Sequence, residues 1–388
     1  MKTKLLSTLL ALCLILSLLP SSAGAADVLY SGSCGEHASW VLTDDGVMTI
    51  SGTGTVTAPM TNAERSQRSW LIHTLVVEEG ISEIGEEAFA YYDINKIHLP
   101  ESLTTIGNGA FGNNSSLLEV TFGSGLRSIG HGAFFCCRHL RAVDLPTGLT
   151  EIGPAAFVSC SALEALVVPG SVKTIGASAF AQCDALKSVF LLDGVETLGD
   201  GAFQSCWQVT DFYLPDTIRS FGNNCFRSCC SIKLFRIPDG VEEIPAGCFA
   251  ECGSLSTVIL PDSVKSIDRN AFKDSSNLRA LFYAGTEDGL MQIRIDPMGN
   301  EPLAYASTYL IPGMPDPAFG CFDMPARDNW AYDGIAFCLA TGLMNGMGNG
   351  YFQPNGTTTR AQLVTILWRM MDEPKASSPA PFTDLTQD

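Results

Sequence analysis

The sequence predicts a mostly β fold: a solenoid of nine repeats of about 23 residues, with a β-rich segment before it and a small α-helical module after it. The main observation is a phenylalanine that returns after one step of 22 residues and then after seven steps of 23. The same register carries an aliphatic column and a cysteine column. One repeat cannot bury its apolar side alone, whereas stacked copies share a continuous core. The phenylalanine column is Phe89, Phe111, Phe134, Phe157, Phe180, Phe203, Phe226, Phe249 and Phe272.

Residues 1–25 have the pattern of a secretory signal peptide. Lys2 and Lys4 precede an apolar run from Leu5 to Leu19, and Ala23-Gly24-Ala25 provides a small-residue cleavage site. The run is shorter than a bilayer-spanning helix, and no later stretch reaches about 18 uninterrupted apolar residues. We therefore expect an exported chain with no membrane span.

Residues 26–75 are expected to form a β-rich N-terminal cap. Asp45-Gly46 lies between two stretches of alternating apolar residues, which is a hairpin signal. Asp44 and Asp45 lack the spaced oxygen ligands of a calcium loop, so no metal is assigned to them.

Residues 76–310 contain the repeats. The segment LRAVDLP at 140–146 predicts a short strand that ends at the proline. The segment LTEIGPAAF at 149–157 has an apolar spacing compatible with a return arc that contains a short helical or 3₁₀ turn.

Thirteen of the fourteen cysteines follow the expected signal peptide, and six of them form one column of the repeat. Because the phenylalanine and aliphatic columns are core, these cysteines are expected to be small buried side chains. Parallel Cβ vectors on adjacent strands hold two sulfur atoms poorly for bonding, so free thiols are expected rather than disulfides. The column is Cys137, Cys160, Cys183, Cys206, Cys229 and Cys252; Cys225 and Cys248 stand at a neighbouring alanine position.

The repeat resembles that of leucine-rich repeat solenoids. More narrowly, LP-x-x-V-x-x-IG-x-x-AF-x-x-C-x-x-L is similar to the BspA-like leucine-rich repeats of bacterial and protozoan surface proteins. The resemblance covers residues 76–310, of which 282–310 resemble the irregular closing repeat of that family. Residues 27–75 resemble the β-rich segment that often precedes such repeats.

In a solenoid of this kind, the residues beside the strand valine point out of the core and line a concave sheet. The column after the valine is rich in apolar and aromatic residues, although the core does not require them there. An exposed apolar stripe with charged edges would be an interaction site for an extracellular protein or glycan. The alternative is that these residues simply favour strands. The candidate ligand-binding residues are Asp144, Val167, Phe190, Tyr213, Arg236 and Ile259.

A second module follows a Pro- and Gly-rich linker at residues 311–320. Residues 321–374 predict two amphipathic helices, near 331–341 and 360–372, and Thr359 to Gln362 form a capping box at the start of the second. This module resembles a surface-layer homology (SLH) domain, which attaches bacterial proteins non-covalently to secondary cell-wall polysaccharide. The residues that carry the resemblance are Asp323, Trp330, Gly342, Gly346, Phe352, Pro354, Thr359, Arg360, Ala361 and Gln362.

The resemblance implies a polysaccharide site formed by Asp323, Trp330, Thr359 and Arg360. Arg360 would pair with an acidic group of the polymer, because its planar fork suits a carboxylate, and Trp330 would shape the sugar site. The alternative is that Trp330 is core and Arg360 is a solvated first-turn residue. Cys321 and Gln362 depart from the residues that are usual in the family.

Residues 375–388 are expected to be a linker and the start of a second SLH copy, because Asp384 repeats Asp323 at a distance of 61 residues. Such domains usually work as sets of three, so we expect the full protein to extend beyond residue 388.

Charge and motifs exclude several functions. Without Lys2 and Lys4, 21 of the 23 basic residues remain against 41 acidic ones, which argues against nucleic acid or anionic lipid as a partner. No nucleophile elbow, zinc-protease motif or phosphate-binding loop is found, so neither a cofactor nor catalysis is expected. His131, Cys136, Cys137 and His139 could be read as zinc ligands or as a Cys–His pair, but Cys137 belongs to the core column.

The sequence thus favours a secreted protein, anchored to the bacterial cell wall, whose solenoid binds an extracellular partner. Two alternatives remain open. One is a structural component of the cell envelope, and the other is the non-catalytic targeting part of a larger enzyme.

Overall fold

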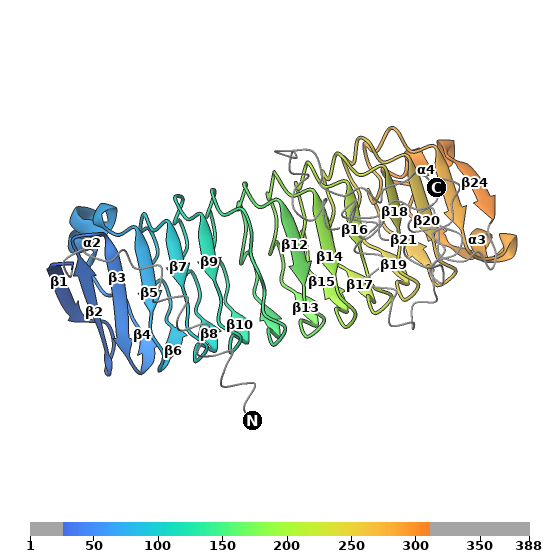
Figure 1. Ribbon diagram of the computed structural model, residues 1–388. Helices are drawn as coiled ribbons and strands as arrows, with labels where there is room; N and C mark the ends of the chain where they lie inside the picture. Colours follow the sequence, from blue (N-terminus) through green and yellow to red (C-terminus); the bar gives the residue numbers. More distant parts are fainter. Residues whose placement is uncertain (1–25, 311–388) are drawn as a thin grey trace, which may run out of the picture.

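The computed structural model describes residues 26–310, which form an elongated β-solenoid of about eleven turns (Figure 1). The mostly β repeat fold that the sequence predicts is therefore confirmed. The expected signal peptide at 1–25, linker at 311–320, SLH module at 321–374 and second copy from 375 lie outside the described residues. Within the described range, no helix has the length and apolar character needed to cross a bilayer.

The N-terminal segment forms three antiparallel strands, β1 (Val28–Ser33), β2 (Ala38–Thr43) and β3 (Val47–Gly52). The predicted hairpin is confirmed, since β2 and β3 pair across a turn in which Gly46 has a φ of 80°. After β4 (Gly54–Val56), the helix α2 (Asn62–Arg68) begins with a capping box between Thr61 and Glu64. The 3₁₀ turn η1 (Ser69–Leu71) then leads into the repeats.

The first face of the solenoid is built from the strands that the sequence predicts, stacked in parallel from coil to coil. The coil around Val143 has no assigned strand, although that side chain is buried like its counterparts. The strands are β5 (Thr74–Val77), β7 (Lys96–His98), β9 (Glu119–Thr121), β12 (Ala165–Val168), β14 (Ser188–Leu191), β16 (Asp211–Tyr213), β18 (Leu234–Arg236), β20 (Thr257–Leu260), β22 (Ala280–Tyr283) and β24 (Ser307–Leu310).

A second parallel face, which the sequence did not predict, is formed at the aliphatic column (Figure 1). Most of its strands have only two residues, too few for an alternating pattern to be recognised. They are β6 (Ile81–Ile84), β8 (Thr105–Ile106), β10 (Ser128–Ile129), β11 (Glu151–Ile152), β13 (Thr174–Ile175), β15 (Thr197–Leu198), β17 (Ser220–Phe221), β19 (Glu243–Ile244), β21 (Ser266–Ile267) and β23 (Arg294–Ile295).

The return arc is a series of hydrogen-bonded turns, so the expected short helical or 3₁₀ turn is wrong for the described coils. The N–H of Ala156 donates to the Gly153 carbonyl in its own coil at 3.3 Å, whereas the N–H of Phe157 donates to Ala179 in the next coil at 2.8 Å. Ala155 and Ser159 have left-handed φ values of 53° and 59°. Because alternate N–H groups bond to the neighbouring coil, the arc is satisfied without a helix.

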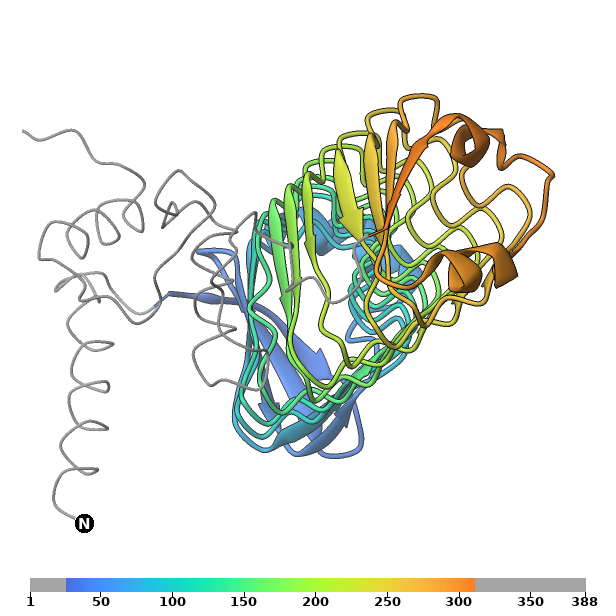
Figure 2. The same cartoon turned by 90° about the vertical axis from the view of Figure 1, so that its right-hand side faces the viewer.

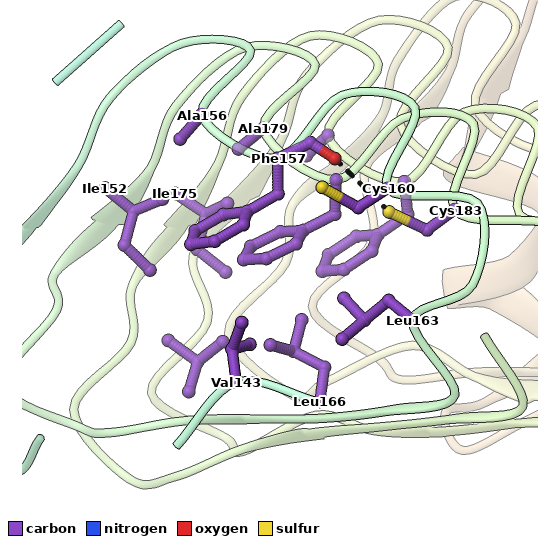
Figure 3. Packing of buried hydrophobic residues seen from close by; sticks show 14 of the residues in the cluster. Val143, Ile152, Ala156, Phe157, Cys160, Leu163, Leu166, Ile175, Ala179 and Cys183 are labelled. Atoms are coloured by element: carbon purple, nitrogen blue, oxygen red, sulfur yellow. Dashed lines mark hydrogen bonds between the residues drawn. The ribbon is translucent and has the colours of Figure 1, made fainter. Parts of the chain in front are cut away.

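The core is organised around the phenylalanine column. Neighbouring rings of this column stack with centroids 5.1 to 6.1 Å apart, and all nine are fully buried. Figure 3 shows the part of the stack around Phe157. Offset stacking of this kind adds favourable contacts beyond the apolar area that is buried. The column therefore explains why the 23-residue period is kept so strictly.

The cysteine column is buried and forms no disulfide, as expected. All eleven described cysteines are free thiols, and the six column members have no exposed surface. The structure adds a role that the sequence analysis missed. Each column thiol donates a hydrogen bond to the phenylalanine carbonyl of the preceding coil, as Cys160 does to Phe134 at 3.3 Å. The equivalent bond from Cys183 to Phe157, at 3.4 Å, is drawn in Figure 3. Burial also raises the thiol pKa values, to about 12 for Cys206 and Cys252.

Both faces are interrupted at the same coil boundary, between β16 and β18 on the first face and between β17 and β19 on the second. We call this boundary the seam. Phe212, Phe221 and Phe235 occupy core positions there that smaller aliphatic residues fill in most coils, with ring centroids of Phe212 and Phe235 5.9 Å apart. Pro245 stands where most coils have a glycine that donates its N–H to the preceding coil, a bond that proline cannot form. Of the backbone-to-backbone hydrogen bonds between coils, only those of the arc cross the seam within the described residues, among them the bond from the Phe226 N–H to the Cys248 carbonyl at 2.9 Å.

The closing segment departs from the repeat, as its sequence suggests. It contains the short helices α3 (Glu287–Gln292) and α4 (Glu301–Tyr305), which lie at the C-terminal end of the solenoid (Figure 2). Between and after them, β23 and β24 add a last strand to each face.

Candidate ligand-binding face

The structure places the predicted ligand-binding residues in one outward column of the first face. We call this column the outer row. Val167 lies directly opposite Phe190, and Phe190 lies opposite Tyr213. Beyond the seam, Arg236 lies opposite Ile259. Asp144 is at the corresponding position of the coil that has no assigned strand, and it is exposed. Five of the six residues are thus brought together by strand pairing, in two groups.

The expectation of a continuous exposed apolar stripe is wrong. Val167 has 42% of its surface exposed, but Phe190 has only 7% and Ile259 only 6%. Coils are stacked at the spacing of paired strands, about 4.8 Å, so large neighbours in one column cover each other. Among the six predicted residues, the accessible apolar surface is therefore concentrated at Val167.

Phe190 and Tyr213 form a stacked aromatic pair, with ring centroids 4.7 Å apart and an interplanar angle of 25°. Burial, followed by the nearby Asp211 carboxylate, raises the pKa of Tyr213, so its hydroxyl stays protonated at neutral pH. The pair is a rigid apolar support beside Val167 that carries one neutral hydroxyl group.

Arg236 is less available for a partner than the sequence suggests. Its guanidinium lies 3.2 Å from the Asp216 carboxylate and 2.8 Å from that of Asp239, with 13% of the side chain exposed. The first of these pairs crosses the seam, so Arg236 also joins the two halves of the solenoid.

Tyr309 extends the outer row by one residue that the sequence pattern does not predict, since the same column of the repeats ends at Phe282. Phe282 stacks on Tyr309 of β24, with centroids 5.0 Å apart, and 49% of the Tyr309 surface is exposed. Tyr309 follows Phe282 by 27 residues rather than 23, so the repeat period does not reveal it.

The His–Cys cluster does not form a site in the structure. Cys137 is fully buried and its thiol donates to the Phe111 carbonyl at 3.4 Å. Burial raises the pKa of Cys137, which leaves no thiolate for metal binding or nucleophilic attack. Among residues 26–310, no group of three or more His, Cys, Asp or Glu side chains is arranged to hold a metal ion.

Asp323, Trp330, Thr359 and Arg360, the predicted polysaccharide-binding residues, lie outside the described residues. Their assignment stays a prediction, together with the ligand-binding role of the outer row.

Comparison with known families gives two matches. The family model of the BspA type leucine rich repeat region matches six copies, over residues 82–206 and 150–279, which together span more than half of the chain. The model of the S-layer homology domain matches residues 323–364, a range that contains all four predicted polysaccharide-binding residues.

Solved structures with a similar fold are also leucine-rich repeat proteins. One from T. pallidum is 30% identical, with 50% of this chain and 86% of that chain covered and a TM-score of 0.41. One from Eubacterium ventriosum is 22% identical, with 66% and 85% covered and a TM-score of 0.39. A leucine rich cell surface protein from Faecalibacterium prausnitzii is 19% identical, with 71% and 99% covered and a TM-score of 0.39. A search of curated proteins finds no match.

Proposed function

Because the chain belongs to the BspA-type leucine-rich repeat family and matches the S-layer homology domain over residues 323–364, we propose that it is an exported bacterial surface protein held non-covalently at the cell wall. Both matches are to families of cell-surface proteins rather than enzymes, and S-layer homology domains bind cell-wall polysaccharide. In this proposal, the C-terminal module holds the wall and the solenoid is displayed outwards.

The second part of the proposal is that the first face of the solenoid binds an extracellular protein or glycan. The observation that carries it is the contrast between two columns of the same strands. The buried column stays aliphatic or aromatic in every coil, whereas the outer row changes from acidic to apolar, aromatic and basic residues. Packing explains the first column but not the variation of the second.

The best candidate for the centre of this surface is the region of β12, β14 and β16. Val167 is exposed there beside Ala165, a small exposed residue on the same strand. The exposed carboxylates of Asp144 and Asp211 lie to its sides, which gives an apolar centre with a charged rim.

This binding proposal is tested with Val167→Lys. The chain and its variant are measured against panels of immobilised extracellular proteins and glycans, and the variant is expected to bind its ligand about tenfold more weakly or worse. Thr121→Lys is the matched control, because Thr121 is an exposed residue of the outer row two coils earlier. Equal binding by wild type and Val167→Lys, or no saturable ligand at all, contradicts the proposal.

The anchoring proposal is tested separately with Arg360→Ala, using binding to isolated cell walls from which the secondary polysaccharide has or has not been removed. Wild-type chain is expected to bind only the intact walls, and Arg360→Ala to lose that binding. Arg360→Lys is expected to recover only part of it, because lysine cannot form the two parallel hydrogen bonds of arginine with a carboxylate. Undiminished binding by Arg360→Ala would favour a structural role for this residue.

A structural role in the cell envelope is the second candidate function. It is favoured by β1 and β24, the strands at the two ends of the first face: neither contains a charged residue, and within residues 26–310 no strand pairs with their outer edges.

A further inference from the structure

The first face of the solenoid ends in an open edge strand at both of its ends: β1 at the N-terminal end and β24 at the C-terminal end (Figure 1). Within residues 26–310, nothing pairs with the outer edge of either strand. All six residues of β1 and all four of β24 are exposed. Neither strand contains a charged residue or a proline, although these are the usual means by which proteins protect such edges.

The two edges run in the same direction. β1 is antiparallel to β2, and β2 is antiparallel to β3, so β1 points the same way as β3. β3 pairs in parallel with β5, the first strand of the repeats, and β24 pairs in parallel with β22. A second copy of the chain, placed head to tail, would therefore present its β1 parallel to β24 of the first and continue the ladder.

The outward hydrogen-bonding groups of β24 can be identified. The N–H of Ser307 donates to the Arg279 carbonyl at 2.8 Å, beside β22. Because the backbone groups of a strand alternate in direction, those of Thr308 and Leu310 point away from β22. Thr308 lies opposite Leu281, which is buried, so its side chain is on the core side of the sheet.

The outward groups of β1 follow from the same reasoning. The N–H of Cys34 donates to Ala38 at 2.9 Å, so the backbone groups of Gly32 and Tyr30 also point towards β2, and those of Ser31 and Ser33 point outwards. Gly32 and Tyr30 lie opposite the buried residues Trp40 and Leu42, which places them on the core side. The register irregularity of β1 lies at Val28 to Tyr30, so the stretch from Tyr30 to Ser33 is regular.

These two patterns are complementary. In a parallel pair, a residue that bonds across lies opposite one whose groups point away, and both side chains are on the same face. The backbone groups of Thr308 point outwards from β24, and its side chain is on the core side of the sheet. The backbone groups of Gly32 and Tyr30 point towards β2, away from the proposed partner strand, and these two residues are also on the core side. The core sides of both sheets would therefore remain continuous across the junction.

We propose that copies of this protein associate head to tail, with Ser31 and Ser33 of β1 in one copy hydrogen-bonded to Thr308 and Leu310 of β24 in the next. Exposed apolar side chains at the two ends, among them Leu29, Tyr309 and Leu310, add to the contact. The interface joins two different surfaces, so each copy can bind one further copy at each end and linear chains of molecules can grow. The proposal is independent of the ligand-binding role of the outer row.

The test is the sedimentation of the chain that starts at Ala26, over about 1 to 100 µM, because the extent of association rises with concentration. Ser31→Pro and Thr308→Pro each remove one outward N–H while leaving the bonds to β2 and β22. Wild type is expected to form a concentration-dependent series of oligomers, and each variant alone to be monomeric. An equimolar mixture of the two variants is expected to form dimers and nothing larger, since one intact edge of each kind remains.

Ser31→Val and Thr308→Val are the matched controls, because they keep the N–H groups, and both are expected to associate like wild type. If a proline variant loses its fold by circular dichroism, Ser31→Lys or Thr308→Lys replaces it. The proposal is overturned if wild type is monomeric throughout, if both proline variants associate like wild type, or if only one of them is affected. The second result would place the contact elsewhere in the chain, and the third would indicate pairing of like edges.

Discussion

At the scale of single residues, the position of Cys160 has a requirement beyond small size. In the second coil this position is Asn114, whose side-chain amide donates to the Phe89 carbonyl at 2.7 Å. In the ninth it is Ser275, whose hydroxyl donates to Phe249 at 2.6 Å. Asparagine, cysteine and serine share a donor but little else. The position therefore selects a buried group that satisfies the preceding coil's phenylalanine carbonyl.

Thiol labelling tests the state of this column. The thiolate is the species that attacks an alkylating agent, and burial both blocks access to the column thiols and raises their pKa values. In native protein, the exposed Cys230 is expected to react with N-ethylmaleimide, while the six column cysteines stay unmodified up to about pH 9 and react only in urea. Peptide mass spectrometry assigns the sites. Rapid native labelling of Cys183 or Cys206 would contradict the buried column.

Gly176 illustrates why most coils have a glycine directly after the residue of the aliphatic column. A Cβ at this position would lie 2.5 Å from the backbone of Gly153 and Pro154 in the preceding coil. Gly176→Ala is therefore expected to lower the free energy of unfolding by about 1–3 kcal/mol, because the backbone must shift. Gly253→Ala is the matched control: a Cβ there has no heavy atom within 4 Å, and its stability should change little. Urea unfolding compares the two, and equal losses would refute this explanation.

At the scale of elements, the sequence predicts the strands whose pattern recurs in each repeat, but not the features that depend on contacts between neighbouring coils. The strands around Leu166 and Val189 follow from the spacing of apolar residues, and Pro169 marks the end of the first. The second face could not be predicted, because a strand as short as Thr174–Ile175 is defined by its neighbours and not by its own pattern. The outer row was found by its register, but the burial of Phe190 depends on the neighbours stacked against it.

The seam shows how a few substitutions alter an element. In most coils the residue before a strand donates its N–H to the preceding coil, as Ser256 before β20 does to Lys233 at 2.8 Å and Lys265 before β21 does to Glu242 at 2.7 Å. No backbone bond from the N–H of Lys233 or Glu242 is found within the described residues. The aromatic side chains of Phe212, Phe221 and Phe235 hold the coils together there in place of the ladders.

Hydrogen exchange measures this difference. The amides of Lys233 and Glu242 are expected to exchange at least about tenfold faster than those of Ser256 and Lys265, their equivalents one coil later, whose N–H groups are bonded at 2.8 and 2.7 Å. The comparison is made by mass spectrometry with fragmentation to single residues. Equal protection at the two pairs of sites would show that the seam does not weaken the solenoid.

At the scale of the whole molecule, charge is the dominant long-range term. The formal net charge is −18, and the ion pairs between coils, such as Lys173–Glu196 at 3.4 Å, are exposed and contribute little. Screening the excess of carboxylates should therefore favour the folded state.

Thermal unfolding at low and moderate salt tests this balance. Raising sodium chloride from about 0.02 to 0.3 M is expected to raise Tm by about 2–4 °C, since repulsion among carboxylates is relieved more than attraction within the exposed pairs is lost. Sodium chloride is preferable to sulfate, which stabilises proteins by exclusion from their surface. A Tm that falls with salt would show that the exposed pairs outweigh the repulsion.

The constant period of the phenylalanine column has a consequence for the gene. Wherever a segment of one full repeat is removed or copied in frame, the new joint falls between equivalent positions of two coils, and the chain on both sides meets the neighbours it requires. Recombination between repeats would then shorten or lengthen the molecule in steps of one coil, about 4.8 Å each, without a new core having to be found. The distance that the solenoid can span would therefore change in evolution by whole numbers of coils.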